Sequence, residues 1–480
     1  MQPINFISLI PIIIIAASPV VLMLVIAIKR NHFTINILSL LFLLAAFISV
    51  IYISGGAAVR IEPLFIIDGY ALFYIGLLTA ASFIVVILSY KYLESYRGNK
   101  EEFYVLLFTA LLGSSILTIS KHFVSFFLGL EILSVSLYTL IAYSKEYKNA
   151  LEGGAKYLIL AAVSSAFLLF GMALIYADTG SMDFYQIAMR LPGITPNSVL
   201  VMGGIAMIIV GVGFKLAVVP FHMWTPDVYQ GASAPVSAFI ASVSKGGMLA
   251  LLLRFFGLIN FGTFGFIMLI FTIISIASMV AGNLLALLQK NVKRILAYSS
   301  IANFGYMLVA FVSAGSVGVE AATFYLTAYF IVILGSFGIV SVLSDGEHET
   351  EDIEDYRGLF WRRPMIALVF TAMLFSLAGI PLTAGFIGKY YLLAAGVNSS
   401  LWLLVFVLVG TSVIGLFYYL RIIKTMFQRD EDSEGKEVVR PRVRVHVAGG
   451  LALAFLTIVL IWFGVLPSGL LSLLRTMLKM

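Results

Sequence analysis

The sequence predicts an all-α polytopic membrane protein, and three observations support that fold class. Hydrophobic residues make up 61% of the 480 residues. Charged residues make up only 11%, against roughly a quarter in soluble globular chains. Apolar runs of about 20 residues, long enough to cross a bilayer as a helix, recur from one end of the sequence to the other.

Hydropathy predicts about fourteen membrane spans. The first apolar run has no basic residue before it and is too long for the core of a signal peptide, so we expect it to be a membrane helix. The predicted spans are 4–28, 34–54, 71–93, 103–120, 122–143, 156–177, 199–221, 234–257, 263–288, 293–313, 321–343, 365–396, 401–427 and 446–474.

Basic residues are concentrated in alternate loops, and this asymmetry predicts the orientation. The positive-inside rule assigns such loops to the cytoplasmic side of the cell (inner) membrane. On this rule Lys29, Arg30, Lys290, Lys293 and Arg294 face the cytoplasm. With an even number of spans, both termini are expected on the non-cytoplasmic side.

Several kinds of site are not expected in this chain. The sequence contains no cysteine, which excludes disulfides, thiolate metal sites and iron–sulfur clusters held by this chain. The five histidines are too scattered for haem ligation, and no nucleotide-binding motif is present. The net charge of +6 follows from the loops and needs no nucleic acid. We therefore expect neither a cofactor nor a metal bound by this chain.

Two loops, 345–363 and 428–444, depart from the apolar pattern, because each is acidic and then basic. One interpretation is a solvated, mobile cytoplasmic connection, and the other is a docking surface for neighbouring subunits. Neither loop is expected to form a domain of its own. The whole chain, 1–480, is therefore predicted to be one membrane domain.

Two predicted spans carry both a lysine and a proline, and both are expected to be broken helices. Lys215 precedes Pro220 in one, and Pro381 precedes Lys389 in the other. Proline removes a backbone donor and clashes with the preceding helical turn, which frees carbonyl groups. Interrupted helices at corresponding positions are typical of inverted-repeat transporters.

The two breaks lie five spans apart, which predicts two inverted five-helix repeats, spans 4–8 and 9–13. The first repeat covers residues 103–257 and the second covers 263–427, each forming a half-channel. Three leading helices (1–102) and one trailing helix (446–480) complete the predicted domain.

Five ionisable residues lie within or at the mouth of apolar spans: Glu131, Lys156, Lys215, Lys245 and Lys389. A charged side chain at membrane depth costs a few kcal/mol, so such residues normally face a partner or a hydrated path. A lysine in a low-dielectric site loses hydration of its charged form, and a nearby carboxylate restores its preference for the proton. A change in the separation of Glu131 and Lys215 could therefore switch the lysine between holding and releasing a proton.

The proton-transfer role of each of these residues has an alternative. Glu131 and Lys215 could be a static buried ion pair. Lys156 could extend to the cytoplasmic headgroups rather than form a proton entrance. His222, seven residues after Lys215, would share its face if the break does not rotate the helix, and could then relay protons. The alternative for His222 is a helix-packing role.

Longer motifs show a resemblance to a known family, the antiporter-like membrane subunits of proton-pumping NADH:quinone oxidoreductase, respiratory complex I. The sequence most resembles the one called subunit N, and it is also related to Mrp-type cation/proton antiporter subunits. The resemblance implies a fourteen-helix subunit that translocates protons without redox chemistry of its own. The motifs are LGLEILSVSLYTLIAY (128–143), GFKLAVVPFHMWTPDVYQGASAPVSAFIASVSK (213–245), NVKRILAYSSIANFGYML (291–308), YRGLFWRRP (356–364) and SLAGIPLTAGFIGKYY (376–391).

The resemblance also implies a role for each intramembrane residue. Glu131 matches the family's glutamate on the fifth span, and Lys215 matches its partner on the first broken helix. Lys245 matches the central lysine, Lys389 the gate residue, and Lys156 a lysine that opens the sixth span. NAD, FMN, iron–sulfur clusters and quinone would then belong to partner subunits. The partners would be a neighbouring antiporter-like subunit, small membrane-arm subunits and the lipid bilayer.

Three functions therefore stay open. The first is a proton-translocating subunit of NADH:quinone oxidoreductase, which makes the chain part of an enzyme. The second is a subunit of a Mrp-type antiporter or a related membrane-bound redox complex, although sodium transport favours more intramembrane carboxylates than Glu131. The third is a scaffold that conducts nothing, which would leave the lysines unexplained.

Overall fold

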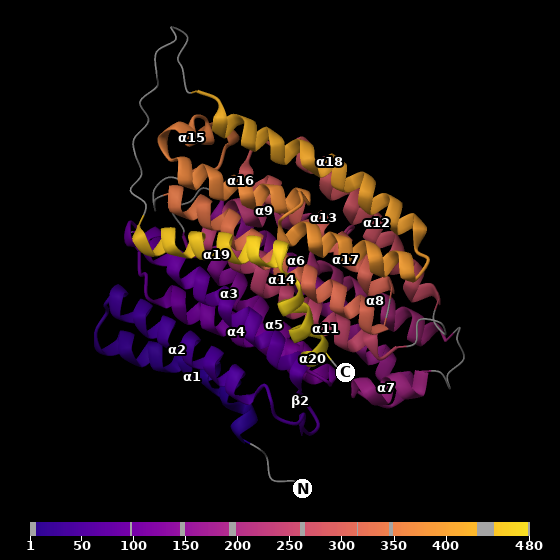
Figure 1. Ribbon diagram of the computed structural model, residues 1–480. Coiled ribbons are helices and arrows are strands. Elements are labelled where there is room, and N and C mark those ends of the chain that lie inside the picture. Colours follow the sequence, from indigo (N-terminus) through magenta and orange to yellow (C-terminus); the bar gives the residue numbers. More distant parts are fainter. Residues whose placement is uncertain are drawn as a thin grey trace.

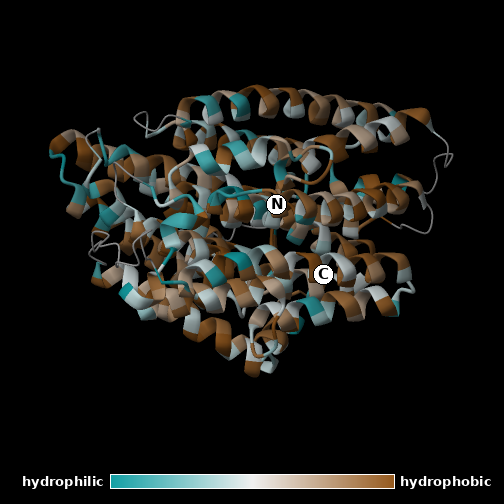
Figure 2. Ribbon diagram, turned by 90° about the horizontal axis from the view of Figure 1, so that it is seen from above, coloured by the Kyte–Doolittle hydropathy of each residue, from teal (hydrophilic) through white to brown (hydrophobic). Residues whose placement is uncertain are grey.

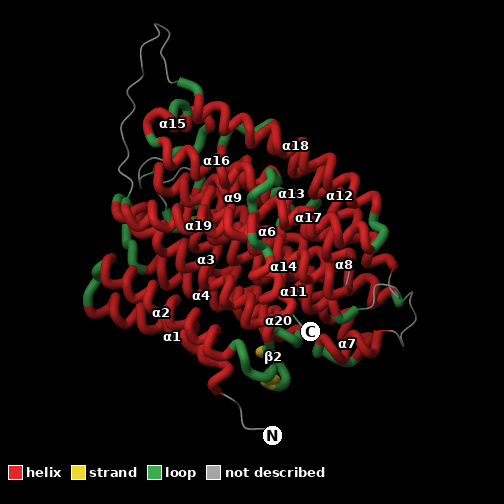
Figure 3. The backbone as a smooth tube through the Cα atoms, in the orientation of Figure 1, coloured by secondary structure: helices red, strands yellow, loops and turns green. Residues whose placement is uncertain are grey.

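Helices form almost the whole structure, as Figure 3 shows in red. The computed structural model describes residues 6–478 except 97, 145–148, 192–197, 260–264, 314, 345–348 and 430–445. Within this part, 13 helical stretches are long and apolar enough to cross a membrane. The broken pair α16 and α17 supplies one more crossing, so the predicted fold class is confirmed. Most of the second charged loop, 428–444, lies outside the described residues.

The leading helices run antiparallel and define the two ends of the bundle. The short β-hairpin between α2 and α3 marks one end, here called the hairpin end. The turn that contains Lys29 and Arg30 marks the opposite end, here called the basic end. Side-chain caps begin two of these helices, because Asn31 accepts from the backbone N–H of Thr34 and Asp68 from that of Ala71. The elements are a 3-10 turn (Phe6–Leu9), α1 (Ile10–Ile28), α2 (His32–Ile53), β1 (Val59–Ile61), β2 (Phe65–Ile67) and α3 (Gly69–Glu94).

The next helices correspond to the predicted first repeat. The broken span is α8 followed by α9, and the next span contains a five-residue π-helical turn, η3, between α10 and α11. Helix α4 packs on α5, and α6 packs on α8. The elements are α4 (Glu102–Ile119), α5 (Phe123–Ile141), α6 (Ala150–Thr179), α7 (Phe184–Arg190), α8 (Val199–Leu216), α9 (Trp224–Gly231), α10 (Ala234–Phe239), η3 (Ile240–Ser244) and α11 (Lys245–Gly257).

The remaining long helices correspond to the predicted second repeat. Helix α12 packs on α13, while α14 contacts α3, α10, α13, α16, α17 and α19 and so lies at the centre of the bundle. The second broken span is α16 followed by α17. The limits of the two repeats stay a prediction. The elements are α12 (Gly265–Leu287), α13 (Val292–Ser313), α14 (Gly315–Leu343), η4 (Ile353–Tyr356), α15 (Leu359–Arg362), α16 (Pro364–Ala378), α17 (Ala384–Asn398) and α18 (Trp402–Phe427).

The trailing segment differs from the predicted span 446–474. Helix α19 (Val447–Val465) ends well before residue 474, and a separate helix, α20 (Ser468–Met477), follows. Pro467 lies at the junction, where its ring prevents the helix from continuing. Helix α20 is amphipathic, with Leu470, Leu471 and Leu474 buried against the bundle, so it does not extend the span.

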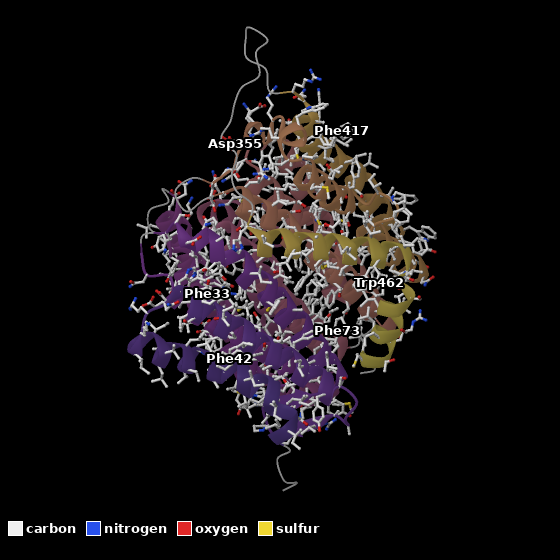
Figure 4. The ribbon with its side chains drawn as sticks, turned by 60° about the vertical axis from the view of Figure 1, so that its left-hand side comes forward. Phe33, Phe42, Phe73, Asp355, Phe417 and Trp462 are labelled. Carbon is white, nitrogen blue, oxygen red and sulfur yellow. The ribbon has the colours of Figure 1, made fainter. Side chains whose placement is uncertain are left out.

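Burial separates the core helices from those that face the bilayer. The span Ala234–Gly257 is 100% buried in its most apolar window, against 33% for the span Val447–Val465. Figure 2 shows hydrophobic residues, coloured brown, along most of the helices. Figure 4 shows Phe417 and Trp462 at the outside of the bundle, where their side chains are 65% and 59% exposed. Figure 1 shows α18 along the upper edge of the bundle and α19 across its front, so both helices lie at the surface of the bundle.

Candidate functional site

The first helix break places a lysine at the end of α8. The helix ends at Leu216, and residues 217–223, including Pro220, are not helical. The break leaves carbonyl groups without helical partners. The carbonyl oxygen of Phe214 accepts both from the backbone N–H of Ala217 and from the indole Nε1 of Trp224, each at 3.0 Å. The break expected at Pro220 is therefore present.

Lys215 is buried in the last turn of α8, with only 2% of its surface exposed. Its Nζ donates to the hydroxyl of Tyr157 at 2.6 Å and to that of Ser134 at 3.1 Å. It also lies 5.3 Å from the centre of the Tyr157 ring, a distance at which a cation is attracted to the ring face. A cation at a helix C-terminus is further favoured by the helix dipole.

Glu131 lies on the same helix as Ser134, three residues earlier, and so on nearly the same face of α5. Its carboxylate accepts a hydrogen bond from Ser165 on α6. Among the ion pairs of the described residues, none joins the Lys215 ammonium to a carboxylate within 4.0 Å. Glu131 and Lys215 therefore bond to different hydroxyl groups in the described structure, and they do not form a direct ion pair.

Lys245 is 0% exposed and begins α11 directly after the π-helical turn. Its Nζ donates to the hydroxyl of Ser300 at 2.8 Å. The rings of Phe304 and Tyr229 lie 4.9 Å and 5.5 Å from the same nitrogen. π-Helical turns are rare and frequently occur at functional sites, because they rotate the residues that follow. Lys245 thus has a single hydroxyl acceptor and two aromatic faces in the described structure.

Lys389 occupies the second helix break. Helix α16 ends at Ala378 and α17 begins at Ala384, with Pro381 in the segment between them. The Lys389 Nζ donates to the carbonyl oxygens of Leu377 at 2.8 Å and Ala378 at 3.0 Å. A third donation goes to the hydroxyl of Ser412 at 2.8 Å. The lysine therefore satisfies carbonyls that the break leaves free.

His222 and Lys156 lie apart from the three buried lysines, Lys215, Lys245 and Lys389. His222 is buried, but it lies in the non-helical segment 217–223, so the helical spacing that would put it on the face of Lys215 does not apply. Lys156 lies near the basic end and is 43% exposed in its side chain. It pairs with Glu152 at 2.7 Å and with Asp227 at 2.8 Å. Neither residue contacts the three buried lysines through an interaction found among the described residues.

Polar side chains on and around α13 lie between the region of Lys245 and that of Lys389. Ser299, adjacent to Ser300, shares a hydrogen bond with Tyr419. Lys389 lies 5.2 Å from the centre of the Tyr306 ring. Four further hydrogen bonds among these side chains were not predicted from the sequence: Asn303 donates to Ser299, Tyr325 donates to Asn303, Asn283 donates to Tyr306, and Tyr418 donates to Asn283. The available signal was the spacing of 299, 303 and 306 on one helical face.

A buried ion pair near the hairpin end also escaped prediction. Arg254, at the end of α11, donates through both Nη atoms to the carboxylate of Asp68 at 2.8 Å. The guanidinium lies 4.6 Å from the centre of the Tyr70 ring, and Tyr70 donates to the carbonyl oxygen of Ala250. Burial alone would raise the pKa of Asp68, but the hydrogen bonds and charge of Arg254 outweigh it and hold that pKa below its usual value.

Asp68→Asn is expected to lower the free energy of unfolding by about 2 kcal/mol at neutral pH, because the asparagine keeps the helix cap but loses the charged hydrogen bonds. A carboxyl whose pKa is lowered by folding stabilises the protein above its unfolded pKa, and that contribution disappears as the pH falls through the folded pKa. The difference in the free energy of unfolding between wild type and variant should therefore be constant from pH 7 to 5. It should shrink below about pH 4. Thermal unfolding in detergent measures it.

The matched control is Asp183→Asn, since Asp183 also caps a helix but its lysine partner, Lys121, is 3.7 Å away. A smaller loss of stability is expected for this variant. Equal losses for the two variants, or a difference that does not depend on pH, would contradict the assignment of the stabilisation to the Asp68–Arg254 pair.

Comparisons with known proteins identify relatives of this chain. The family described as NADH:quinone oxidoreductase/Mrp antiporter, TM, matches residues 120–415. Respiratory complex I from Thermus thermophilus contains a similar chain, with 30% identity, a TM-score of 0.82, and coverage of 96% of this chain and 98% of that one. A chain of the membrane-bound sulfane sulfur reductase, an archaeal respiratory complex, has 26% identity, a TM-score of 0.85 and coverage of 99% and 97%. A chain of the Mrp complex from Dietzia sp. DQ12-45-1b has the same fold, with 21% identity, a TM-score of 0.86 and coverage of 98% and 97%.

Proposed function

Because this chain belongs to the NADH:quinone oxidoreductase/Mrp antiporter transmembrane family, we propose that it is a proton-translocating subunit of a quinone-reducing respiratory membrane complex. The main support for this proposal is the set of hydrogen bonds that Lys215, Lys245 and Lys389 donate. All three are buried, and all three donate to hydroxyl or carbonyl oxygens instead of carboxylates. A static ion pair would fix the charge of a lysine, whereas neutral acceptors leave it able to gain and lose a proton.

The proposed path runs through these lysines in order. Movement of Glu131 relative to Lys215 changes the stability of the lysine's charged form, because the attraction between two charges falls with their distance. The proton then passes to Lys245 and on to Lys389, from which the second half-channel opens to the far side. The entrance role of Lys156 and the relay role of His222 stay sequence-based predictions, and neither is a step of this proposed path.

The proposed assembly follows from the same function. The chain lies in the cell (inner) membrane with both termini on the non-cytoplasmic side, next to another antiporter-like subunit and small membrane-arm subunits. NAD, FMN, iron–sulfur clusters and quinone bind to other subunits. The second candidate is a subunit of another membrane-bound redox complex, which the likeness to a sulfane sulfur reductase chain favours.

Purification of the native assembly distinguishes these functions. A quinone-reducing complex should retain subunits with flavin and iron–sulfur absorbance and should reduce quinone when NADH is added. Flavin or cluster absorbance with reduction of sulfane sulfur instead would support the second candidate. An assembly without redox centres that exchanges cations for protons would contradict both and indicate an antiporter.

Lys215→Ala is expected to lower the initial rate of substrate-driven proton uptake about tenfold in reconstituted complex, because the variant loses the group that responds to Glu131. The rate is measured with a pH-sensitive dye inside vesicles. Lys290→Ala is the control, since Lys290 lies in a loop at the basic end and is exposed. Undiminished uptake by the Lys215 variant, with normal assembly, would rule out the switch.

A further inference from the structure

Helix α19 ends directly against the second helix break, residues 379–383 between α16 and α17. Its buried residues form one stripe along the helix, and Gly464 is the last of them. Trp462, two residues earlier, points to the other side of the helix, at the outside of the bundle in Figure 4. Helix α19 contacts both halves of the broken span, α16 and α17. The buried stripe therefore brings the end of α19 to the break.

Gly464 lies against the backbone of the break. A methyl group added to it would lie 2.5 Å from the carbonyl oxygen of Leu382 and 2.6 Å from the Cα of Thr383. Both distances are shorter than normal contacts of a Cβ atom, and backbone atoms cannot rotate away as the end of a flexible side chain can. Ordinary contacts begin at 3.4 Å, so any other residue at this position would push the helix and the break apart by about 1 Å.

The part of the break that Gly464 contacts has an unusual backbone conformation. Leu382 has a φ angle of 69°, in the left-handed region that is unfavourable for a residue with a side chain. Its side chain is 71% exposed, so packing of that side chain within this chain does not hold the conformation. Thr383 is buried, and its hydroxyl donates to the carbonyl oxygen of Ile380 at 2.7 Å. Because strained backbone persists only where its surroundings fix it, the contact with α19 and this hydrogen bond are the supports of the break.

The same break holds Lys389. The carbonyl oxygens of Leu377 and Ala378 end α16 and accept from the lysine, which lies on α17, at 2.8 Å and 3.0 Å. The lysine also lies against Gly379, where an added Cβ would come within 3.0 Å of the lysine Cδ. An N–H···O hydrogen bond spans about 2.7–3.2 Å. A displacement of the break by about 1 Å would therefore remove at least one acceptor from the lysine.

We propose that Gly464 is a positioning residue for Lys389. Its backbone contact with Leu382 and Thr383 fixes the break, and the break in turn holds the carbonyl oxygens that accept from the lysine. The inference rests on the proposed role of Lys389 in proton transfer, and it adds to that site a helix outside both predicted repeats. A glycine that served only the packing of α19 would affect the stability of the complex but not the lysine.

Gly464→Ala is expected to lower the initial rate of substrate-driven proton uptake about tenfold in the reconstituted complex, because it displaces the acceptors of Lys389. The matched control is Gly469→Ala, in α20, where nothing lies within 4 Å of an added Cβ. This control should keep uptake within about twofold of wild type. Native gel electrophoresis compares assembly. Normal uptake by the Gly464 variant would overturn the inference.

Combination with Lys389→Ala separates positioning from a general loss of stability. The proposed function predicts that Lys389→Ala alone lowers proton uptake about tenfold. Residues that act as a unit are not additive, so Lys389→Ala/Gly464→Ala should match Lys389→Ala within about twofold. A further tenfold loss in the double variant would show that Gly464 acts elsewhere and would contradict the inference. Full uptake by Lys389→Ala would contradict the proposed function itself, whereas a defect in Lys389→Ala without one in Gly464→Ala contradicts the inference alone.

A second double variant covers the case in which Gly464→Ala does not assemble. Leu382→Gly/Gly464→Ala gives the break a residue with wide backbone freedom, so the break can move away from the added methyl group and the complex should assemble. Its proton uptake should stay about tenfold low, and hydrogen exchange of the amides in 379–388 should be faster than in Leu382→Gly alone. Leu382→Gly alone should keep uptake within about twofold, because glycine adopts a φ of 69° readily. Full uptake by this double variant would refute the positioning role, and so would its failure to assemble, because Gly464 would then serve assembly.

Discussion

Lys245→Ala is expected to lower the initial rate of proton uptake about a hundredfold or more, while the complex still assembles. Lys245 is fully buried and begins α11 in the middle of the bundle, with the hydroxyl of Ser300 as its acceptor. An alanine methyl group cannot carry a proton, and the aromatic rings beside it offer no replacement. The measurement is proton uptake by reconstituted complex, with assembly followed on native gels.

The matched control is Ser242→Ala, on the same membrane span. Ser242 is also fully buried, but its hydroxyl donates to the carbonyl oxygen of Ala238 on its own helix, so its loss should leave proton uptake within about twofold. The rate of proton uptake by Ser300→Ala should lie between those of the Lys245 and Ser242 variants. This substitution removes the hydroxyl that accepts from Lys245 but keeps the lysine itself. Full uptake by the Lys245 variant would show that protons take another route.

Glu349→Ala is expected to lower the free energy of unfolding by about 3–5 kcal/mol, the cost of leaving one member of a buried ion pair alone. The Glu349 side chain is 3% exposed and pairs with Lys293, which is 0% exposed. Its carboxylate also accepts from the backbone N–H of Ala234 at 2.8 Å and from the hydroxyl of Tyr92. One side chain therefore joins α3, α10 and α13, and thermal unfolding in detergent measures its removal.

Two further variants isolate the cause. Glu351→Ala removes the second, more distant carboxylate, 3.5 Å from Lys293 and 26% exposed, and should cost about 1 kcal/mol. Lys293→Met combined with Glu349→Leu removes both charges and should recover most of the lost stability, because neither buried charge is left unpaired. If the two glutamate variants lost equal stability, the exposed and the buried partner would contribute alike, and the ion-pair explanation would fail.

Glu349 also shows what the sequence could not predict. The acidic–basic loop 345–363 was expected to be a solvated connection or a docking surface. Instead, Glu349 and Glu351 lie against the bundle and pair with Lys293, more than fifty residues earlier in the chain. A run of charges in a loop is locally indistinguishable from a solvated segment, and only the folded chain brings its partner close.

The broken helices were predictable because their causes are local. Pro220 and Pro381 each lie in a non-helical segment, with Lys215 at the end of the preceding helix and Lys389 early in the following one. Hydropathy also predicted the spans well, except at the last one, where Pro467 ends the helix early. The pairing of Arg254 with Asp68 was missed because a charge near a helix end is ordinary in a membrane protein.

The bonding of Lys389 has a consequence for its protonation. A lysine ammonium has three N–H donors, and here all three find acceptors: the carbonyl oxygens of Leu377 and Ala378 and the hydroxyl of Ser412. A neutral amine at the same place would have two N–H groups and a lone pair. It could keep both carbonyl oxygens as acceptors while its nitrogen accepts a hydrogen bond from the hydroxyl of Ser412, because a hydroxyl can serve as donor or acceptor. The helix break therefore offers a full set of hydrogen-bond partners to either protonation state, and the two states differ in the direction of a single hydrogen bond.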